Sequence, residues 1–301
     1  CKDHAVLLVS MLHAVGVPAE LALVNINQRV LPELPNIDQF DHMIVSVPLD
    51  NGRLYIDSTD KDLRLGTTPP RYMAGNYALV LGDAPELLAI PDVAVGDSGL
   101  QVERDIERID DDQLRVTEVG VFSGYQAADM RGQLREIESS EMLGTMQRWV
   151  ADRYSDAIVD DAFVDNVFDA SGELVVELQY RLPIDAESFR LPGFFEATFL
   201  DYERLPERRF DFEIRVPLSV STVTTVRQSP VSRLGVAAKK PDADESKFGS
   251  WRRKIDSSDE GWILSVEYTS RHDEYEAEDY SEFTDFHRRL VGSIEQPMLF
   301  E

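Results

Sequence analysis

The sequence has 301 residues, of which 43% are hydrophobic and 29% are charged, so the chain can bury a sizeable core and is long enough for two domains. Lys and Arg total 30 against 56 Asp and Glu, which gives a formal net charge of −26. A chain this acidic repels phosphate, which argues against nucleic acid as a partner. The single cysteine excludes an internal disulfide, and no apolar run reaches the roughly 18–20 residues of a membrane span.

The first part of the chain, residues 1–95, is expected to form an α+β unit. Apolar residues recur three and four positions apart over residues 1–14, which predicts a helix, and Gly16 follows as a stop signal. Prolines and glycines in residues 83–100 place a domain boundary near residue 95. Runs rich in β-branched and aromatic residues predict strands at residues 20–26, 42–47 and 53–59, with a further short strand from Tyr77.

The second part, residues 96–301, is expected to be a mostly β domain with a helical insertion. Residues 124–152 predict two helices, with Ser140 as the N-cap of the second. An amphipathic helix is predicted at residues 278–296, and residues 236–249 are expected to form a polar loop. Strands are predicted at residues 114–122, 173–182, 212–218, 221–227 and 261–270.

Cys1 is the candidate nucleophile. Thiol catalysis requires a thiolate, a base that takes its proton and a group that fixes the tautomer of the base. Cys1 lies at the start of the predicted first helix, where the partial positive charge and unpaired N–H groups stabilise a thiolate. The same N–H groups can donate to the oxyanion of a tetrahedral intermediate. The alternative is that a cysteine at a helix start is incidental.

His42 and Asp57 are the candidates for the base and the residue that orients it. His42 opens the first strand of the predicted hairpin, and Asp57 lies on the partner strand. Asp is depleted in strands and costly to bury unless it is paired. Because side chains alternate along a strand, both plausible registers put the two residues on the same face. The alternative is a structural pair without a catalytic role.

The register of this hairpin decides whether the pair can form. A two-residue turn at residues 51–52 would leave His42 roughly 13 Å along the strand from the position opposite Asp57. A four-residue loop over residues 48–51 would place the two directly opposite each other, with Cβ atoms about 4.5–5.5 Å apart. Pro48 cannot donate to a ladder, so a strand that ends before it and a four-residue loop are expected.

No metal or other cofactor is expected from the sequence. The histidines other than His42 lie on the first helix or in charged segments near the end, without His-x-x-x-His spacing. There is no EF-hand loop for calcium, no Gly-rich phosphate loop and no Gly-x-Ser-x-Gly elbow.

Three separated motifs in residues 1–82 resemble the transglutaminase-like superfamily. CKDHAVLLVSMLHAVGVPAELALV is similar to the cysteine helix and following strand of bacterial members, and FDHMIVSVPLDNGRLYIDSTD is similar to their histidine and aspartate strands. The resemblance implies a partial papain-like core and a catalytic triad of Cys1, His42 and Asp57. In that family, helices and an oxyanion-hole residue lie before the cysteine, so this chain is expected to be the C-terminal part of such a protein.

The later part of the chain resembles the C-terminal region of bacterial envelope proteins that carry a domain of unknown function before a transglutaminase-like core. The segments RRFDFEIRVPLSVSTVTTV and WILSVEYTS carry this looser similarity, together with the closing helix around Tyr280 and Phe283. It implies a β-rich accessory domain and a periplasmic or secreted location.

The resemblance implies thiol-dependent acyl transfer on an amide of a peptide or protein substrate, through a thioester on Cys1. Hydrolysis is favoured slightly over transamidation, and no residue decides between them. One alternative takes Cys1 as an N-terminal nucleophile whose own α-amine is the base, which leaves His42 and Asp57 without a role. Another is a non-catalytic envelope binding or scaffold module with a vestigial core. The sequence does not indicate an oligomeric state.

Overall fold

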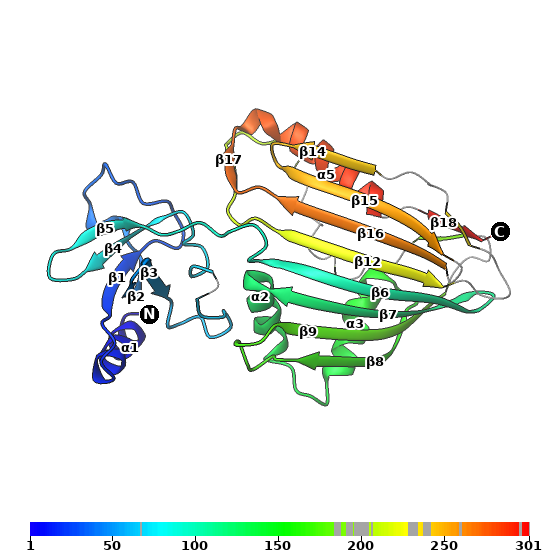
Figure 1. Cartoon of the computed structure of the whole chain (residues 1–301), viewed down its shortest axis with the longest axis horizontal. Coiled ribbons are helices and arrows are strands. Elements are labelled where there is room, and N and C mark those ends of the chain that lie inside the picture. The colour runs from blue at the N-terminus through cyan, green and yellow to red at the C-terminus, as the bar shows by residue number, and fades with distance from the viewer. Residues whose placement is uncertain are drawn as a thin grey trace.

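The strands of the computed structural model form two main sheets that follow each other along the chain (Figure 1). The architecture is α+β and mostly β, as the sequence predicts. None of the described helices is both long enough and apolar enough to span a membrane. The structure describes residues 1–66, 68–183, 188–190, 195, 205, 207–227, 234–236, 242–258, 261–294 and 297–300.

The first sheet has five antiparallel strands in the order β3-β2-β1-β4-β5. One helix, α1, precedes it, and a single 3-10 turn, η1 (Ile37–Gln39), lies before β2. The predicted helix and the first three strands are present, whereas β5 lies in a stretch predicted as loop. The bounds are α1 (Lys2–Ala14), β1 (Glu20–Val24), β2 (His42–Leu49), β3 (Gly52–Ile56), β4 (Tyr77–Leu81) and β5 (Glu86–Ala89).

Helix α1 packs on one face of this sheet because its apolar residues recur at helical spacing. Ala5 is fully buried and packs in one cluster with Leu8 and Leu12 and with Val45 and Val47 of β2. The opposite face of the sheet has a separate cluster, which contains Ala22, Ile44, Tyr55 and Ala78 from the strands and Met73 and Ile90 from loops. The sheet is therefore covered on both faces, as a helix on an antiparallel sheet requires.

The hairpin of β2 and β3 is tighter than the four-residue loop predicted. Leu49 lies opposite Gly52, so residues 50 and 51 form the loop. The predicted strand end before Pro48 is also wrong, since β2 continues through Pro48 to Leu49. The pairing of β1 with β2 ends at Ser46 of β2, so Pro48 lies beyond the end of β1. The N–H that Pro48 lacks therefore costs no hydrogen bond to β1.

The second sheet has eight strands in the order β14-β15-β16-β12-β6-β7-β9-β8. All of its neighbours are antiparallel except β6 and β12, which pair in parallel. Helices α2 and α3 lie between β7 and β8 in the chain, which is the predicted helical insertion. The bounds are β6 (Gly99–Asp110), β7 (Gln113–Ser123), α2 (Gly124–Leu134), α3 (Met142–Arg153), β8 (Ile158–Asp165), β9 (Leu174–Pro183), β12 (Ser219–Arg227), β14 (Asp242–Ser246), β15 (Gly249–Ser258) and β16 (Gly261–Ser270).

Smaller elements complete this half of the chain. The described residues also form a three-stranded sheet with the strand order β10-β18-β13 and a two-stranded sheet of β11 and β17. The predicted closing helix is α5 (Tyr280–Ile294), and residues 295 and 296 of that prediction lie outside the described residues. The other bounds are β10 (Ser188–Arg190), β11 (Phe212–Ile214), β13 (Leu234–Val236), β17 (Asp273–Tyr275), η2 (Ala277–Asp279) and β18 (Pro297–Phe300).

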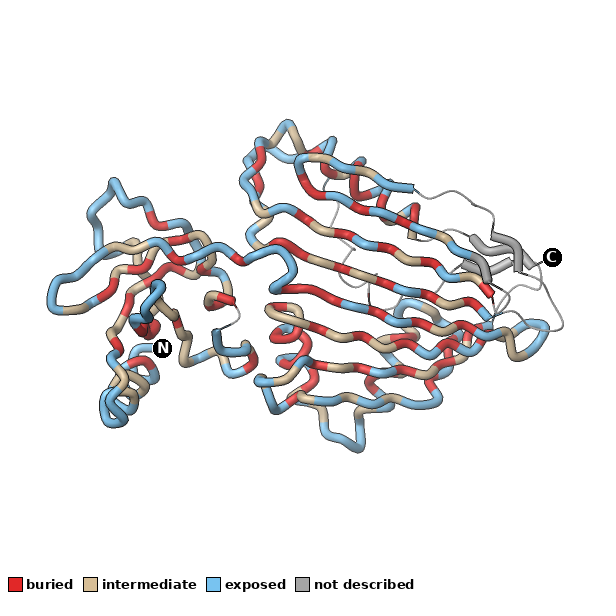
Figure 2. Tube along the Cα trace, in the orientation of Figure 1, coloured by how far each residue is buried: buried red, intermediate tan, exposed pale blue. Residues whose placement is uncertain are grey.

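The helices of this half cover one face of the large sheet. Figure 2 shows buried and exposed positions alternating along its strands, as expected when one face packs and the other meets water. The buried face forms one core cluster with residues of α2, α3 and α5, among them Met130, Val150 and Phe286. The packing of α5 on this core explains the amphipathic pattern that predicted a helix at residues 278–296.

Several sequence predictions for this half are corrected by the structure. β6 and β8 were not predicted, because β6 has a charged residue, Arg104, on its buried face and β8 has only one buried residue, Val159. Residues 236, 242–246 and 249 of the predicted polar loop belong to β13, β14 and β15, while residues 237–241 lie outside the described part of the chain. The predicted N-cap Ser140 is also wrong, because α3 begins at Met142 with Glu141 at the N-cap. The domain boundary near residue 95 falls between β5 and β6 and stays a prediction.

Candidate active site

Cys1 occupies the N-cap position of α1. Its carbonyl accepts the first helical hydrogen bond, from the N–H of Ala5 at 3.0 Å, and its side chain caps no N–H of the helix. The thiol is free and exposed. As the N-cap residue, Cys1 lies at the positive end of the helix dipole, where the N–H groups of the first turn have no helical partner.

The topology brings the start of α1 and the start of β2 to the same end of the first sheet. α1 reverses direction through residues 15–19 into β1, and the His13 ring bonds the Ala19 carbonyl at 2.8 Å across this turn. β1 is antiparallel to β2, with Val24 at its end opposite His42. Two reversals make α1 run in the same direction as β2, on which it packs, so the first residues of these elements, Cys1 and His42, are expected at the same end of the sheet.

His42 and Asp57 are in direct contact. Nε2–H of His42 donates to Oδ2 of Asp57 at 2.9 Å, and the two side chains are only 11% and 13% exposed. The proton must sit on Nε2, because an ionised carboxylate only accepts. In the neutral imidazole, this tautomer has the lone pair on Nδ1, which is the form that a general base needs.

Asp57 is fixed by a second contact through its other oxygen. Oδ1 accepts from the backbone N–H of Thr59 at 2.9 Å and from the Thr59 hydroxyl at 2.7 Å. Sequence reasoning did not give Thr59 a role, although Asp followed two residues later by Thr is a known local turn pattern. Both carboxylate oxygens are therefore occupied, and the side chain has a defined orientation.

The pairing of His42 and Asp57 is diagonal and not directly cross-strand. β3 ends at Ile56, which lies opposite Val45, so the position facing Asp57 is Ile44. The expected register with His42 opposite Asp57 is therefore wrong by two residues. The contact still forms because both residues share a face and the long imidazole reaches the diagonal neighbour.

The structure brings together two of the three candidate residues. His42 shares a sheet face with Ile44, whereas α1 packs on the face that carries Val45 and Val47. Among the described residues, the exposed Cys1 thiol makes no hydrogen bond to His42 or Asp57. Cys1 lies at the same end of the sheet as the pair, and its membership in a triad stays a proposal.

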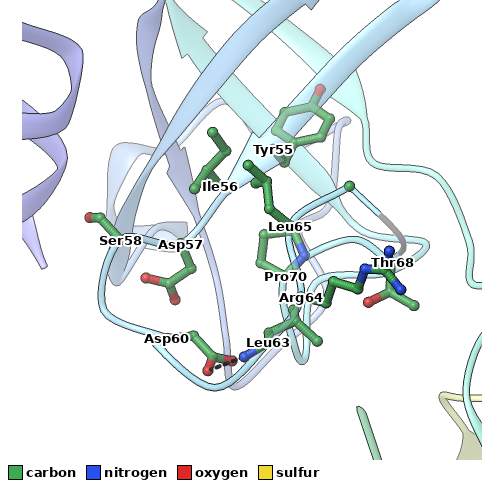
Figure 3. A pocket seen from close by; sticks show the side chains of 11 residues that line it. Tyr55, Ile56, Asp57, Ser58, Asp60, Leu63, Arg64, Leu65, Thr68 and Pro70 are labelled. Carbon is green, nitrogen blue, oxygen red and sulfur yellow. Dashed lines mark hydrogen bonds between the residues drawn. The ribbon is translucent and has the colours of Figure 1, made fainter. Parts of the chain in front are cut away.

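A cavity of about 240 Å³ lies beside Asp57 (Figure 3). Its polar lining includes Asp57, Ser58 and Asp60, and its apolar lining includes Leu63 and Leu65. The Ser58 hydroxyl is buried without a hydrogen-bond partner among the described residues. Among all the residues that the structure describes, no group of three or more His, Cys, Asp or Glu side chains is arranged to hold a metal ion.

Comparison with known proteins gives a distant likeness of fold. No protein-family model matches the sequence, and no curated protein matches it significantly. A crystal structure described as a "putative protease" from Parabacteroides distasonis ATCC 8503 is similar over 98% of this chain, with a TM-score of 0.52 and 13% sequence identity. This chain spans 42% of the length of that one. At such low identity the similarity shows a shared fold alone.

Proposed function

We propose that this protein is a transglutaminase-like cysteine enzyme that cleaves or transfers the acyl group of an amide, with Cys1 as nucleophile, His42 as base and Asp57 as the orienting residue. The observation that carries the proposal is the shielded contact of His42 with Asp57, 2.9 Å long. This contact supports the proposal because a cysteine nucleophile needs a base whose tautomer a neighbouring group fixes. The description of the similar structure also supports a peptidase-like activity.

The proposed reaction uses each of these groups in turn. Nδ1 of His42 takes the thiol proton of Cys1, and the thiolate attacks the carbonyl carbon of the substrate amide. The C–N bond breaks as His42 returns the proton to the leaving amine, which leaves a thioester on Cys1. Water, deprotonated by His42, then attacks the thioester carbonyl, releasing a carboxylic acid and regenerating the thiol. Asp57 stabilises the imidazolium that forms in both halves.

Hydrolysis is preferred over transamidation in this proposal, because the similar structure is described as a protease and water needs no acceptor site. The expected substrate is a peptide or protein amide. The net charge of −26 fits a partner other than nucleic acid. The periplasmic or secreted location implied by the sequence resemblance is part of the same proposal.

The test is alkylation of Cys1 by iodoacetamide across pH. An ordinary thiol reacts with a midpoint near its pKa of about 8.5, whereas a thiolate paired with an imidazolium reacts far below it. We expect fast reaction of the unaltered protein at pH 6, and a loss of about 10- to 100-fold at that pH in His42→Ala.

The matched control is His4→Ala, because His4 lies exposed on the same helix as Cys1. This variant should keep the profile of the unaltered protein. An ordinary thiol profile in the unaltered protein, indifferent to His42→Ala, would contradict the proposal. The cysteine would then have no assisting base.

A further inference from the structure

The chain that leaves β3 at Asp57 is tied into a compact turn. We call residues 57–66 and 68–71 the Asp57 segment. The N–H of Asp60 donates to the carbonyl of Asp57 at 3.2 Å. Oδ1 of Asp60 accepts in turn from the N–H groups of Asp62 and Leu63, at 3.2 and 3.3 Å. A displacement of Asp60 or Asp62 therefore acts on the backbone that carries Asp57.

Arg71 closes this segment and links it to helix α2 on the other side of the domain boundary. It holds Asp60 in a two-pronged contact, with Nε–H donating to Oδ2 at 2.6 Å and Nη2–H donating to Oδ1 at 3.0 Å. Its third nitrogen, Nη1, donates to Asp129 of α2. Planar two-pronged contacts of this kind fix orientation as well as distance.

Asp62 makes the second link to α2. Its backbone carbonyl accepts from Nη1–H of Arg131 at 3.2 Å, and its carboxylate forms an ion pair with Arg135. Both side chains of this ion pair are largely shielded, at 11% and 16% exposed. Tyr125 adds a third link, since its hydroxyl donates to the carbonyl of Pro69 at 2.7 Å.

Arg131 is the least expected member of this contact. It is 1% exposed and is the largest fully buried side chain of the described residues. Burial lowers the pKa of its guanidinium, as expected for a cation removed from water. Its other donors bind the carbonyls of Asn166, at 3.0 Å, and Gly172, both in the β8–β9 connection. A buried cation held by three carbonyls, one from the Asp57 segment and two from the β8–β9 connection, therefore ties the Asp57 segment to the second sheet.

We propose that helix α2 is a positioning element of the candidate active site, in which Arg135, Arg131 and Asp129 hold the Asp57 segment so that Asp57 keeps its contact with His42. The inference rests on the proposed function and assigns the β-rich half a part in it. Misplacement of a catalytic group by about 1 Å can cost on the order of 100-fold in rate. We therefore expect the contacts of Asp60 and Asp62 with Arg71 and Arg135 to act on His42 through the position of Asp57.

The experiment uses the whole chain with Asp62→Asn and Asp129→Asn, each of which removes one charged link to α2. The first readout is the NMR signal of the Nε2–H proton of His42, which the bond to Asp57 protects from exchange. We expect this signal to broaden or disappear in both variants. The second readout is Cys1 alkylation by iodoacetamide, which should slow about 10-fold at pH 6.

Conservative and distant variants serve as controls. Arg135→Lys keeps a cation beside Asp62, so this variant should retain most of the His42 proton signal and of the alkylation rate. Arg181→Gln removes a two-pronged pair with Asp160 in β9 and β8, outside the Asp57 segment, and should change neither readout. Should Asp62→Asn fail to fold by circular dichroism, Asp129→Asn carries the test, because that side chain is 51% exposed.

The outcomes separate this inference from the proposed function. An unchanged His42 proton signal in folded Asp62→Asn and Asp129→Asn would overturn the inference, whatever the thiol does. An ordinary thiol profile in the unaltered protein, together with loss of the His42 signal in the variants, would overturn the proposed function and leave α2 as a positioning element for the His42–Asp57 pair.

Discussion

At the scale of single residues, the candidate site depends on how Asp57 uses its two oxygens. One accepts from His42 and the other from Thr59, so the carboxylate has little freedom to turn. The residue types that make this pair could be predicted from the sequence, because an Asp at the end of an apolar strand needs a partner. The register of the hairpin could not be predicted from the sequence. The predicted loop length rested on excluding Pro48 from the strand, whereas β1 ends before it reaches Pro48 and so leaves room for a proline there.

Asp57→Asn is expected to reduce activity strongly without unfolding the protein. Asn keeps an acceptor for Thr59, but its amide group presents a donor to His42 and favours the wrong imidazole tautomer. We expect turnover, or Cys1 alkylation at pH 6, to fall about 10²- to 10⁴-fold. Asp50→Asn, an exposed change in the hairpin loop, is the control and should have no effect. Normal rates in Asp57→Asn would remove Asp57 from the mechanism.

At the scale of elements, β6 and β7 carry two Arg–Glu pairs in very different surroundings. Arg104 lies opposite Glu118, and Glu107 lies opposite Arg115. The first pair is buried, with Nη2–H of Arg104 donating to Glu118 at 2.7 Å and side chains 3% and 0% exposed. Nη1–H of Arg104 also donates to the Thr224 hydroxyl, and the Tyr180 hydroxyl donates to Glu118. The second pair is about half exposed. This buried polar pair is also why β6 was not predicted, since a charge on its buried face disrupts the apolar alternation.

Arg104→Met is expected to destabilise the protein far more than Arg115→Met. The first change leaves Glu118 buried without its cation, which costs about 3–5 kcal/mol of unfolding free energy. The second removes an exposed pair worth about 0–1 kcal/mol. Urea unfolding measures the loss of unfolding free energy in each of the two variants. Arg104→Met combined with Glu118→Leu should recover most of the loss, and an equal effect of the two single changes would contradict the burial of the first pair.

At the scale of the whole molecule, the succession of a helix on a small sheet and a larger β-rich half could be predicted from the sequence. Local patterns are strong where a strand has one apolar face, as in β16, whose predicted bounds match the structure. The contacts between the two halves could not be predicted. Arg131 and Asp62 are 69 residues apart in the chain, and nothing in the local pattern marks a guanidinium that reaches a distant carbonyl.

Buried tyrosines make the stability of the whole protein sensitive to alkaline pH. Burial and the nearby Glu118 charge raise the pKa of Tyr180 well above its ordinary value, and burial likewise raises that of Tyr125. The two protonated tyrosines contribute fully to the unfolding free energy below their pKa in the unfolded chain, which is about 10. This contribution decreases as the pH rises above that value, because the tyrosines of the unfolded chain release their protons first.

We therefore expect the unfolding free energy to fall above pH 10 by up to about 1.4 kcal/mol per pH unit for each such tyrosine. Urea unfolding at pH 9 to 11.5 measures how steeply the unfolding free energy falls with pH. In Tyr180→Phe this slope should be shallower by the contribution of one tyrosine. The comparison is made on slopes because this variant also loses a hydrogen bond to Glu118 at every pH. An unchanged slope would contradict the raised pKa of Tyr180.

The parallel pairing of β6 and β12 has a consequence for how the large sheet assembles. On each side of this seam, four strands pair antiparallel with one another. The seam itself joins positions such as Arg104 and Thr224, which are 120 residues apart. Closing so long a loop costs more chain entropy than forming any of the hairpins. We therefore expect each half of the sheet to form before β6 pairs with β12. Completion of the sheet then requires the association of two preformed halves of four strands each.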